Sequence, residues 1–219
     1  MVIQLGNFPT VAAYRARFRL NSWLKKPLVL CHFDIMNTET MHYLNIFLGF
    51  GAILLQVFSV IILLILLFRP KENKKNILLD FVHKHFLAIS FLISLFATLF
   101  SLVYSEIINF PACSLCWFQR IFMYPLVFMF GVAFWDRDKK VVRYALPLLC
   151  AGFLISIYQN FVYYFGDSSN APCDASGISC YKQYISEFGG YISIPILALT
   201  AFFSLLVLVL VAHFYHKED

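Results

Sequence analysis

The sequence predicts an all-α membrane protein that crosses the bilayer five times. Hydrophobic residues make up 61% of its 219 residues and charged residues only 13%. A soluble domain carries roughly 25% charged residues, so much of this protein's surface must face lipid. The apolar segments lack the period-2 alternation of a membrane β-barrel. The helix is the other structure that satisfies all backbone hydrogen bonds within lipid.

Five segments approach the length of about 20 apolar residues that a helix needs to cross about 30 Å of hydrocarbon. They are residues 43–68, 86–105, 117–135, 144–165 and 191–211. In the third segment the purely apolar part begins only at Ile121. Prolines fall inside the last three segments, where packed membrane helices tolerate them.

The distribution of basic residues predicts the orientation. The connections at 69–85 and 136–143 are rich in lysine and arginine, whereas the other two are poor in both. Because basic residues concentrate in cytoplasmic loops, we expect both basic connections and the C-terminus in the cytoplasm. Residues 106–116 and 166–190 are then outside. This placement explains the net charge of +5 without a nucleic-acid partner.

The N-terminal extension does not fit this orientation. Five crossings place it outside, yet it carries Arg15, Arg17, Arg19, Lys25 and Lys26. Either translation starts at Met36 or Met41, or the first apolar segment does not fully cross the membrane. We favour the later start, because it leaves a short and nearly neutral tail. A cleavable signal peptide is not expected, because the first apolar segment is too long and is followed by lysines.

Four of the six cysteines fall in the two connections that are expected outside the cytoplasm. They form two close pairs, which are Cys113 with Cys116 and Cys173 with Cys180. Disulfides persist outside the cytoplasm and are rare within it. The positions of the cysteines and of the basic residues are therefore two independent indications of the same orientation.

The spacing of Cys113 and Cys116 is the more informative of the two. A Cys-x-x-Cys pair can close a small, reducible disulfide, and it favours the thiolate of one member. Cys116 lies near the start of the third helix, where unpaired N–H groups and the helix dipole stabilise an anion. Arg120 follows one turn later on the same helical face and can reach back toward the Cys116 sulfur. These features predict one stabilised thiolate at the lipid boundary.

The cysteines allow two other interpretations, a zinc site and structural disulfides. A zinc site usually has four ligands at short spacings, but six residues separate Cys173 from Cys180 and neither outer connection contains histidine. A second alternative is that both disulfides are purely structural. Against it, a loop as short as 106–116 has little conformational entropy for a crosslink to remove. Cys150, in the middle of the fourth helix, is expected to be buried as a small hydrophobe. Cys31 receives no role.

The stretch from Pro111 to Pro125, Pro-Ala-Cys-Ser-Leu-Cys-Trp-Phe-Gln-Arg-Ile-Phe-Met-Tyr-Pro, closely resembles the signature of the DsbB family of disulfide bond formation proteins. It is most similar to the compact BdbC-like branch of Gram-positive bacteria, and the resemblance covers roughly residues 85–213. The chain departs from the family at Ala112, where proline is common. It also departs at Gln159, where relatives often carry a histidine, and this puts a proton relay at that position in doubt.

The resemblance implies a four-helix transmembrane bundle over residues 86–215. The chain departs from the family by one additional N-terminal transmembrane helix with its basic linker at 42–85, which is not part of this core. An extension at 1–41 and a cytoplasmic tail at 216–219 complete the chain. The resemblance also implies a place in the bacterial cell membrane, with both cysteine pairs on the extracytoplasmic face. The implied disulfides are Cys113–Cys116 and Cys173–Cys180.

The resemblance further implies a membrane thiol–disulfide oxidoreductase that reoxidises a thioredoxin-fold extracytoplasmic thiol oxidase of the DsbA or BdbD type. This partner attacks the Cys173–Cys180 disulfide, and Cys173 is favoured for the mixed disulfide. The electrons then pass through Cys113 and Cys116 to a membrane quinone, either ubiquinone or menaquinone. The quinone is expected beside Cys116 and Arg120.

The side chains that follow Cys116 each have two possible roles. Trp117 and Phe118 could border the quinone ring, but Trp117 could equally anchor the helix at the membrane interface. Gln119 could bond a quinone carbonyl or extend toward water. Two rival functions are a vitamin K epoxide reductase-like quinone-linked oxidase and a non-catalytic membrane protein with structural loop disulfides. The arginine four residues after the second cysteine, and the Cys-x-x-Cys motif preceding the loop pair, favour the DsbB type.

Overall fold

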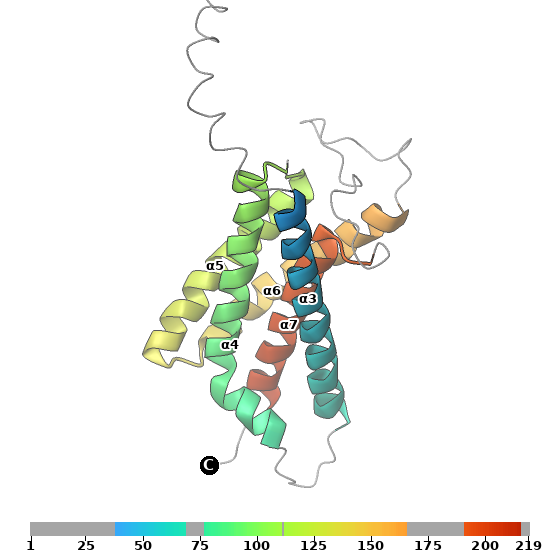
Figure 1. The fold of residues 1–219 in the computed structure, drawn as a ribbon. Helices are drawn as coiled ribbons and strands as arrows, with labels where there is room; N and C mark the ends of the chain where they lie inside the picture. Colours follow the sequence, from blue (N-terminus) through green and yellow to red (C-terminus); the bar gives the residue numbers. More distant parts are fainter. Residues whose placement is uncertain (1–37, 69–76, 111, 166–190, 216–219) are drawn as a thin grey trace, which may run out of the picture. The chain divides into compact units, whose positions relative to one another are not determined.

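The computed structural model describes residues 38–68, 77–110, 112–165 and 191–215 of the chain. Within these ranges the chain is helical and contains no β-sheet. The helices are α3 (Thr38–Leu67), α4 (Ile77–Leu102) with its continuation η2 (Val103–Ile107), α5 (Ser114–Asp136), α6 (Val141–Phe165) and α7 (Ile194–Phe214) (Figure 1). Five helices in these ranges are long and apolar enough to cross a membrane, which confirms the predicted all-α membrane class.

Several predictions fall outside the described residues. They concern the N-terminal residues 1–37 with Cys31, most of the first basic connection, the connection at 166–190 with Cys173 and Cys180, and the tail at 216–219.

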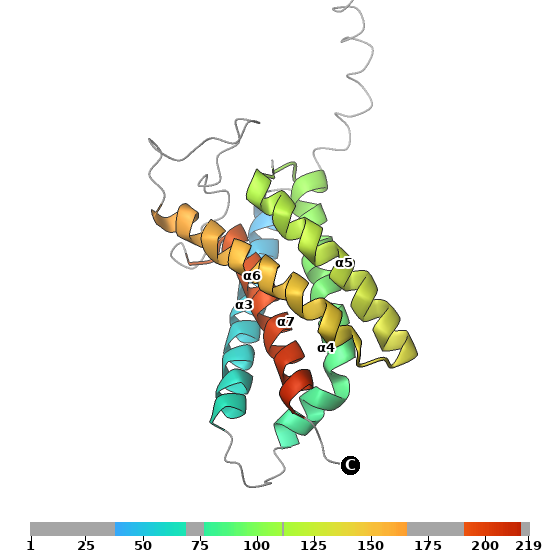
Figure 2. The same ribbon diagram turned by 180° about the vertical axis from the view of Figure 1, so that it is seen from behind.

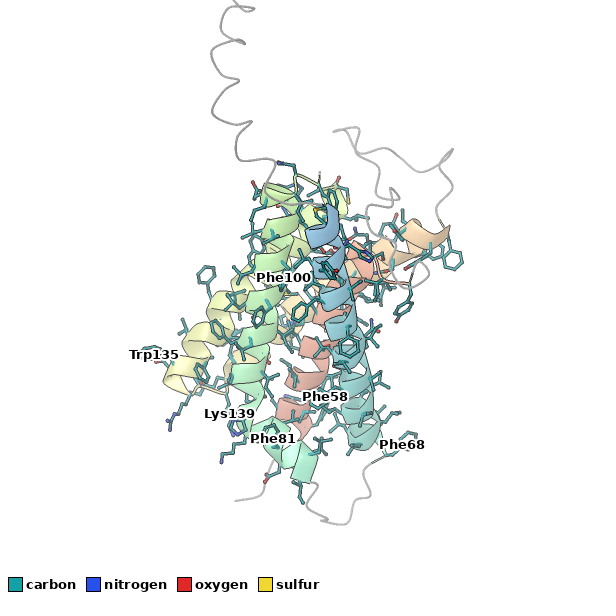
Figure 3. The ribbon with its side chains drawn as sticks, viewed as in Figure 1. Phe58, Phe68, Phe81, Phe100, Trp135 and Lys139 are labelled. Carbon is teal, nitrogen blue, oxygen red and sulfur yellow. The ribbon has the colours of Figure 1, made fainter. Side chains whose placement is uncertain are left out.

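Four helices pack in a ring, in which α4 contacts α5 and α7, and α6 contacts the same two helices (Figure 2). Large apolar side chains fill the interior, among them the almost wholly buried Phe86, Phe130 and Phe202. The outer side chains are apolar too, and Trp135 is 87% exposed (Figure 3). Helices that are apolar on all faces suit a lipid environment. Because lipid is as apolar as leucine, close packing and interhelical hydrogen bonds hold such helices together.

From Asn45 onward, α3 lies beside α4 and α7. Ile62 of α3 is fully buried in a second apolar cluster with Val82 of α4 and Val211 of α7. In the same interface Ser59 Oγ donates a hydrogen bond to Ser204 Oγ at 2.9 Å. A buried hydroxyl costs free energy unless it is hydrogen-bonded, so this pair fixes the register of α3 on α7.

The second helix begins earlier than predicted. It starts at Ile77 rather than at residue 86. The prediction was too short because His83, Lys84 and His85 interrupt the apolar run, although they do not break the helix. His83 Nε2 lies 3.2 Å from Lys139 Nζ in the turn between α5 and α6. A membrane helix can extend beyond the hydrocarbon, so apolarity alone underestimates its length.

Cys150 does not pack in the interior as expected. Its side chain is exposed on α6, on the outside of the ring of helices, and the prediction that it is buried is wrong. Because α6 is apolar on all sides, its sequence does not indicate which face turns inward.

Gly152 allows α6 and α7 to approach each other closely. A Cβ atom at this position would overlap the buried ring of Phe202 on α7. We expect Gly152→Ala to lower the free energy of unfolding by about 1–3 kcal/mol, as overpacking typically does. Thermal unfolding of the purified protein in detergent measures this. Gly51→Ala on α3 is the matched control, because a Cβ there meets nothing within 4 Å. Equal melting temperatures for the two variants would contradict the close approach.

Candidate redox site at the start of α5

The two cysteines of the Cys-x-x-Cys motif flank the first residues of α5. Cys113 precedes the helix with an extended backbone, φ −72° and ψ 169°, and its carbonyl oxygen accepts the Trp117 N–H at 3.1 Å. Cys116 lies in the first helical turn, where backbone N–H groups lack helical acceptors and favour negative charge. The predicted position of Cys116 near the helix start therefore agrees with the structure.

The sulfur atoms of Cys113 and Cys116 are 3.2 Å apart. This separation exceeds the ~2.0 Å of a disulfide bond, and small side-chain rotations would close it. Cys113 is buried and Cys116 is partly buried. The Cys113–Cys116 disulfide stays a prediction, and the geometry is compatible with both the dithiol and the disulfide.

Gln159 of α6 is the polar neighbour of this pair. Its Nε2 donates to Cys116 Sγ at 3.2 Å, and Cys113 Sγ lies 3.8 Å away. Gln159 is only 2% exposed, so water does not compete with these contacts, and an N–H donor favours a charged sulfur. Gln159 Oε1 has no hydrogen-bond partner among the described residues. The sequence identified this glutamine only as a departure from histidine, because nothing local indicates that α6 meets the start of α5.

Arg120 is buried, but its guanidinium group contacts α4 rather than the sulfur. Nε donates to Ser101 Oγ at 3.0 Å, and Nη2 donates to the Ser101 carbonyl at 3.1 Å. The guanidinium carbon also lies 5.1 Å from the centroid of the Trp117 ring, a cation–π distance. The expectation that Arg120 reaches back to Cys116 is therefore corrected. Ser101 offers two oxygen acceptors, which bind a guanidinium better than a thiol sulfur does.

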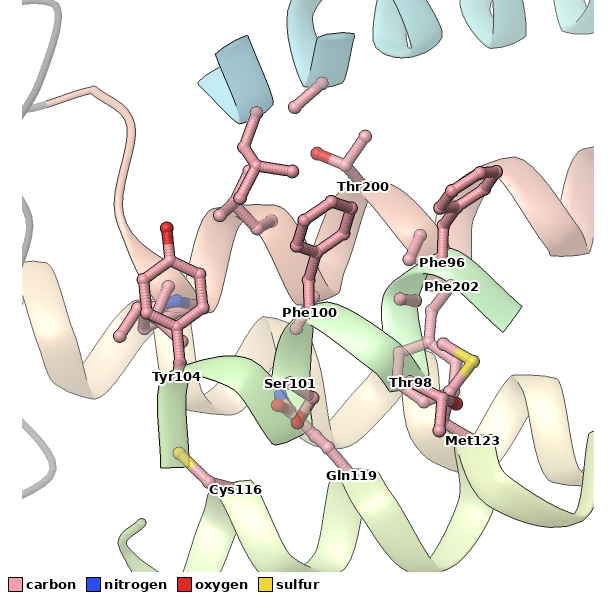
Figure 4. A pocket seen from close by; sticks show the side chains of 18 of the residues that line it. Phe96, Thr98, Phe100, Ser101, Tyr104, Cys116, Gln119, Met123, Thr200 and Phe202 are labelled. Atoms are coloured by element: carbon pink, nitrogen blue, oxygen red, sulfur yellow. The ribbon is translucent and has the colours of Figure 1, made fainter. Parts of the chain in front are cut away.

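An apolar cavity of about 540 Å³ adjoins the cysteine pair (Figure 4). Side chains of α3, α4, α5, α6 and α7 line it, and Cys116, Gln119 and Arg120 are among them. Trp117 and Phe118 are not among the lining residues and are more than half exposed. The structure thus favours the membrane-interface interpretation of Trp117 over a place at the ring.

Gln119 is held between two helices. Its Nε2 donates to Ser156 Oγ of α6 at 3.0 Å, and that hydroxyl donates to the Gly152 carbonyl at 2.8 Å. Because Gln119 is buried, the alternative that it extends toward water is wrong. Its place on the cavity wall keeps the alternative of a ligand contact open.

Thr98 and Tyr124 are also among the lining residues, but their hydroxyl oxygens are buried and have no hydrogen-bond partner among the described residues. The accessible surface of the cavity is mainly apolar, so the cavity suits an apolar ligand. In the described part of the chain, no cluster of three or more His, Cys, Asp or Glu side chains could hold a metal ion.

A close cysteine pair beside an apolar cavity, in a protein with at least five helices that can cross a membrane, defines a membrane-embedded dithiol–disulfide redox protein. Comparison with known proteins identifies the family within this class. A family model described as disulfide bond formation protein DsbB matches residues 83–212. The chain belongs to the DsbB family, and it is a multi-pass membrane oxidoreductase of disulfide formation.

Individual relatives agree with this assignment. The probable disulfide formation protein C 2 of Bacillus anthracis is 38% identical over 138 residues, which are 63% of this chain and 97% of that protein. Disulfide bond formation protein C of Bacillus subtilis (strain 168) is 45% identical over 123 residues, or 56% of this chain and 88% of that protein. A probable disulfide formation protein of Coxiella burnetii (strain CbuK_Q154) is 39% identical over 113 residues, or 51% and 76%. No solved structure matches the chain. The predicted BdbC-like resemblance is confirmed.

Proposed function

We propose that this protein reoxidises a thioredoxin-fold thiol oxidase outside the cytoplasm and delivers the electrons to a membrane quinone. One observation carries the proposal. The Cys116 sulfur lines an apolar cavity of about 540 Å³ and lies 3.2 Å from the sulfur of Cys113. A dithiol in this position can take part in thiol–disulfide exchange and can also pass its electrons to a lipid-soluble acceptor bound in the cavity.

The proposed cycle conserves electrons. A partner thiolate attacks the Cys173–Cys180 disulfide at Cys173 and expels the Cys180 thiolate. The second partner thiol then resolves the mixed disulfide, which leaves the partner oxidised and both loop cysteines reduced. The loop dithiol reduces the Cys113–Cys116 disulfide by the same exchange. A bound quinone supplies an acceptor for the two electrons and two protons that leave when the Cys113–Cys116 disulfide forms again.

The residues around the cavity fit a quinone. A quinone is a flat apolar ring with two carbonyl oxygens, and the cavity volume lies within the range of small-molecule sites, about 300–1,000 Å³. Arg120 adds a buried positive charge to the same wall, and Gln159 stabilises the sulfur of Cys116 as an anion.

Contacts at one end of the helices support the proposed orientation. His83 of α4 lies beside Lys139 of the α5–α6 turn, and its ring centroid is 5.6 Å from that of Tyr215, which follows α7. The start of α4, the basic turn and the end of α7 therefore meet. Basic residues concentrate on the cytoplasmic side, so we propose that this end faces the cytoplasm.

The opposite end holds the cysteine pair and the ends of the second outer connection. Gln159 near the end of α6 contacts Cys116. Tyr164 Oη, one turn further along α6, donates to the Tyr191 carbonyl at 3.0 Å, just before α7. The residues that flank the 166–190 connection thus lie at the end that carries Cys113. This supports the proposal that both cysteine pairs face outside.

Mixed-disulfide trapping tests the partner step. A Cys180→Ser variant keeps Cys173 as a free thiol, whose thiolate should attack the disulfide of an oxidised thioredoxin-fold partner and expel one partner thiolate. Because Cys180 is absent and cannot resolve the mixed disulfide, the covalent complex should accumulate. Non-reducing electrophoresis of the purified protein in detergent would detect it. A Cys173→Ser/Cys180→Ser variant is the control and should form no such complex. If Cys180→Ser also forms no complex while the wild type oxidises the partner, entry through the loop pair is wrong.

A further inference from the structure

Helix α3 is an addition to the part of the chain that matches the family. The family model begins at residue 83, after α3 has ended at Leu67. The structure nevertheless makes α3 a wall of the cavity beside Cys116, through Phe47, Leu48 and Gly51. A helix outside the matched region therefore lines the proposed electron-acceptor site.

Two hydrogen bonds hold α3 in place, one on each side of its cavity-lining segment along the helix. Toward the cysteine end, Tyr104 Oη donates to Asn45 Oδ1 at 2.6 Å. About three turns along α3, Gln56 Nε2 donates to Thr200 Oγ1 of α7 at 2.6 Å. Figure 4 shows Tyr104 and Thr200 on the cavity wall, at η2 and α7. The segment between these two bonds is apolar and lines the cavity.

Between these bonds Gly51 is exposed and lines the cavity, whereas the next residue, Ala52, is buried. A Cβ atom placed on Gly51 would meet nothing within 4 Å, in contrast to Gly152, where it would overlap a ring. Gly51 therefore leaves open space at the side of the α3 interface, where the cavity reaches α3.

The cavity is elongated along α4. On α4 its lining runs from Ser101, beside the cysteine end, to Ile89, which is about 18 Å of helix at 1.5 Å per residue. Near Cys116 the lining includes the polar residues Ser101, Gln119 and Arg120, and toward Ile89 it includes the apolar side chains of Leu92 and Ile93. One polar end and a long apolar extension fit a redox ring that carries a hydrocarbon tail.

We propose that α3 forms the outer wall of a channel for the isoprenoid tail of the quinone, so that the site requires an acceptor with a long tail. This inference rests on the proposed function, because it assumes that a quinone ring lies near Cys116. The tail runs between α3 and the α4–α7 face, and it passes the open space at Gly51.

Filling this space tests the inference. The series Gly51→Ala, Gly51→Leu and Gly51→Phe adds side chains of growing size at a cavity-lining position where a Cβ atom meets nothing within 4 Å. The KM for a long-tailed quinone should rise with side-chain size, and so should its Kd, measured by equilibrium binding to the protein in detergent without a partner. We expect about tenfold for phenylalanine, which corresponds to about two methylene groups of the tail excluded from the channel. The KM for the same quinone ring without a tail should stay unchanged.

Leu54→Phe is the matched control. Leu54 lies on the same helix, is exposed, and is not among the cavity-lining residues, so its replacement should change neither KM. Melting temperatures of all variants show whether they fold, and the alanine and leucine variants carry the test if the phenylalanine variant does not.

The outcomes separate the inference from the proposed function. An unchanged KM for the long-tailed quinone across the Gly51 series, with an active wild type, overturns the channel and leaves the proposed function intact. An equal rise in KM for the tail-less quinone also overturns it, because position 51 would then act on the ring. A wild type that reduces no quinone removes the proposed function, and the inference with it.

Discussion

Replacing Cys116 with serine should abolish oxidation of a reduced thioredoxin-fold partner, and Cys113→Ser should do the same. Serine has a hydroxyl group that neither forms a disulfide nor ionises near neutral pH, so the pair could no longer receive electrons from the loop cysteines. Partner oxidation should fall to the uncatalysed background in both variants. The measurement is the rate of partner disulfide formation with purified protein and added quinone in detergent.

Cys150→Ser is the matched control for this experiment. Cys150 is exposed on α6 and is not among the cavity-lining residues, so its variant should keep the wild-type rate. Quinone-dependent oxidation that persists in Cys116→Ser would show that electrons leave the protein by a route that does not pass through position 116.

Gln159→Met should reduce the reactivity of Cys116 without reducing the stability of the fold. The substitution keeps the length of the side chain and removes the N–H donor that lies 3.2 Å from Cys116 Sγ. A hydrogen bond to a charged group contributes about 1.5–3 kcal/mol, so we expect a roughly 10–100-fold slower alkylation of Cys116 at fixed pH. Partner oxidation should slow in parallel.

The stability of this variant distinguishes the two roles that Gln159 could have. Its Oε1 has no hydrogen-bond partner among the described residues, so an apolar replacement removes a desolvation cost and should leave the melting temperature equal or higher. The neighbouring Asn160 donates to the Pro195 carbonyl at 3.0 Å, and Asn160→Leu should show the opposite pattern of lower stability and normal Cys116 reactivity. A lower melting temperature with normal Cys116 alkylation in Gln159→Met would indicate a purely structural residue.

The helices were predictable because lipid imposes one requirement on every crossing segment. A run of about 20 apolar residues must become a helix to satisfy its own backbone, and this requirement is local. The errors arose where helices continue beyond the apolar run, as α4 does through His83 and Lys84. The inward face of α6 was not predictable either, because its apolar residues surround the helix, and Cys150 was wrongly expected inside.

The family assignment also followed from the sequence, because the Cys113-to-Arg120 motif is contiguous and specific. The contacts within the site did not. Arg120 was expected at the sulfur because helical spacing relates it to Cys116, yet Ser101 on α4 offers two oxygen acceptors and takes the guanidinium group.

The sequence by itself determined the membrane class, the five apolar segments that form helices long enough to cross a membrane, and the cysteine motif that marks the family. Each of these depends on residues that are neighbours in the chain. Only the tertiary structure decided that Gln159 contacts Cys116, that Arg120 binds Ser101, and that α3 borders the cavity. These contacts join residues on different helices. Their geometry depends on how apolar surfaces of similar composition pack against one another, and no local pattern of residues reveals this packing.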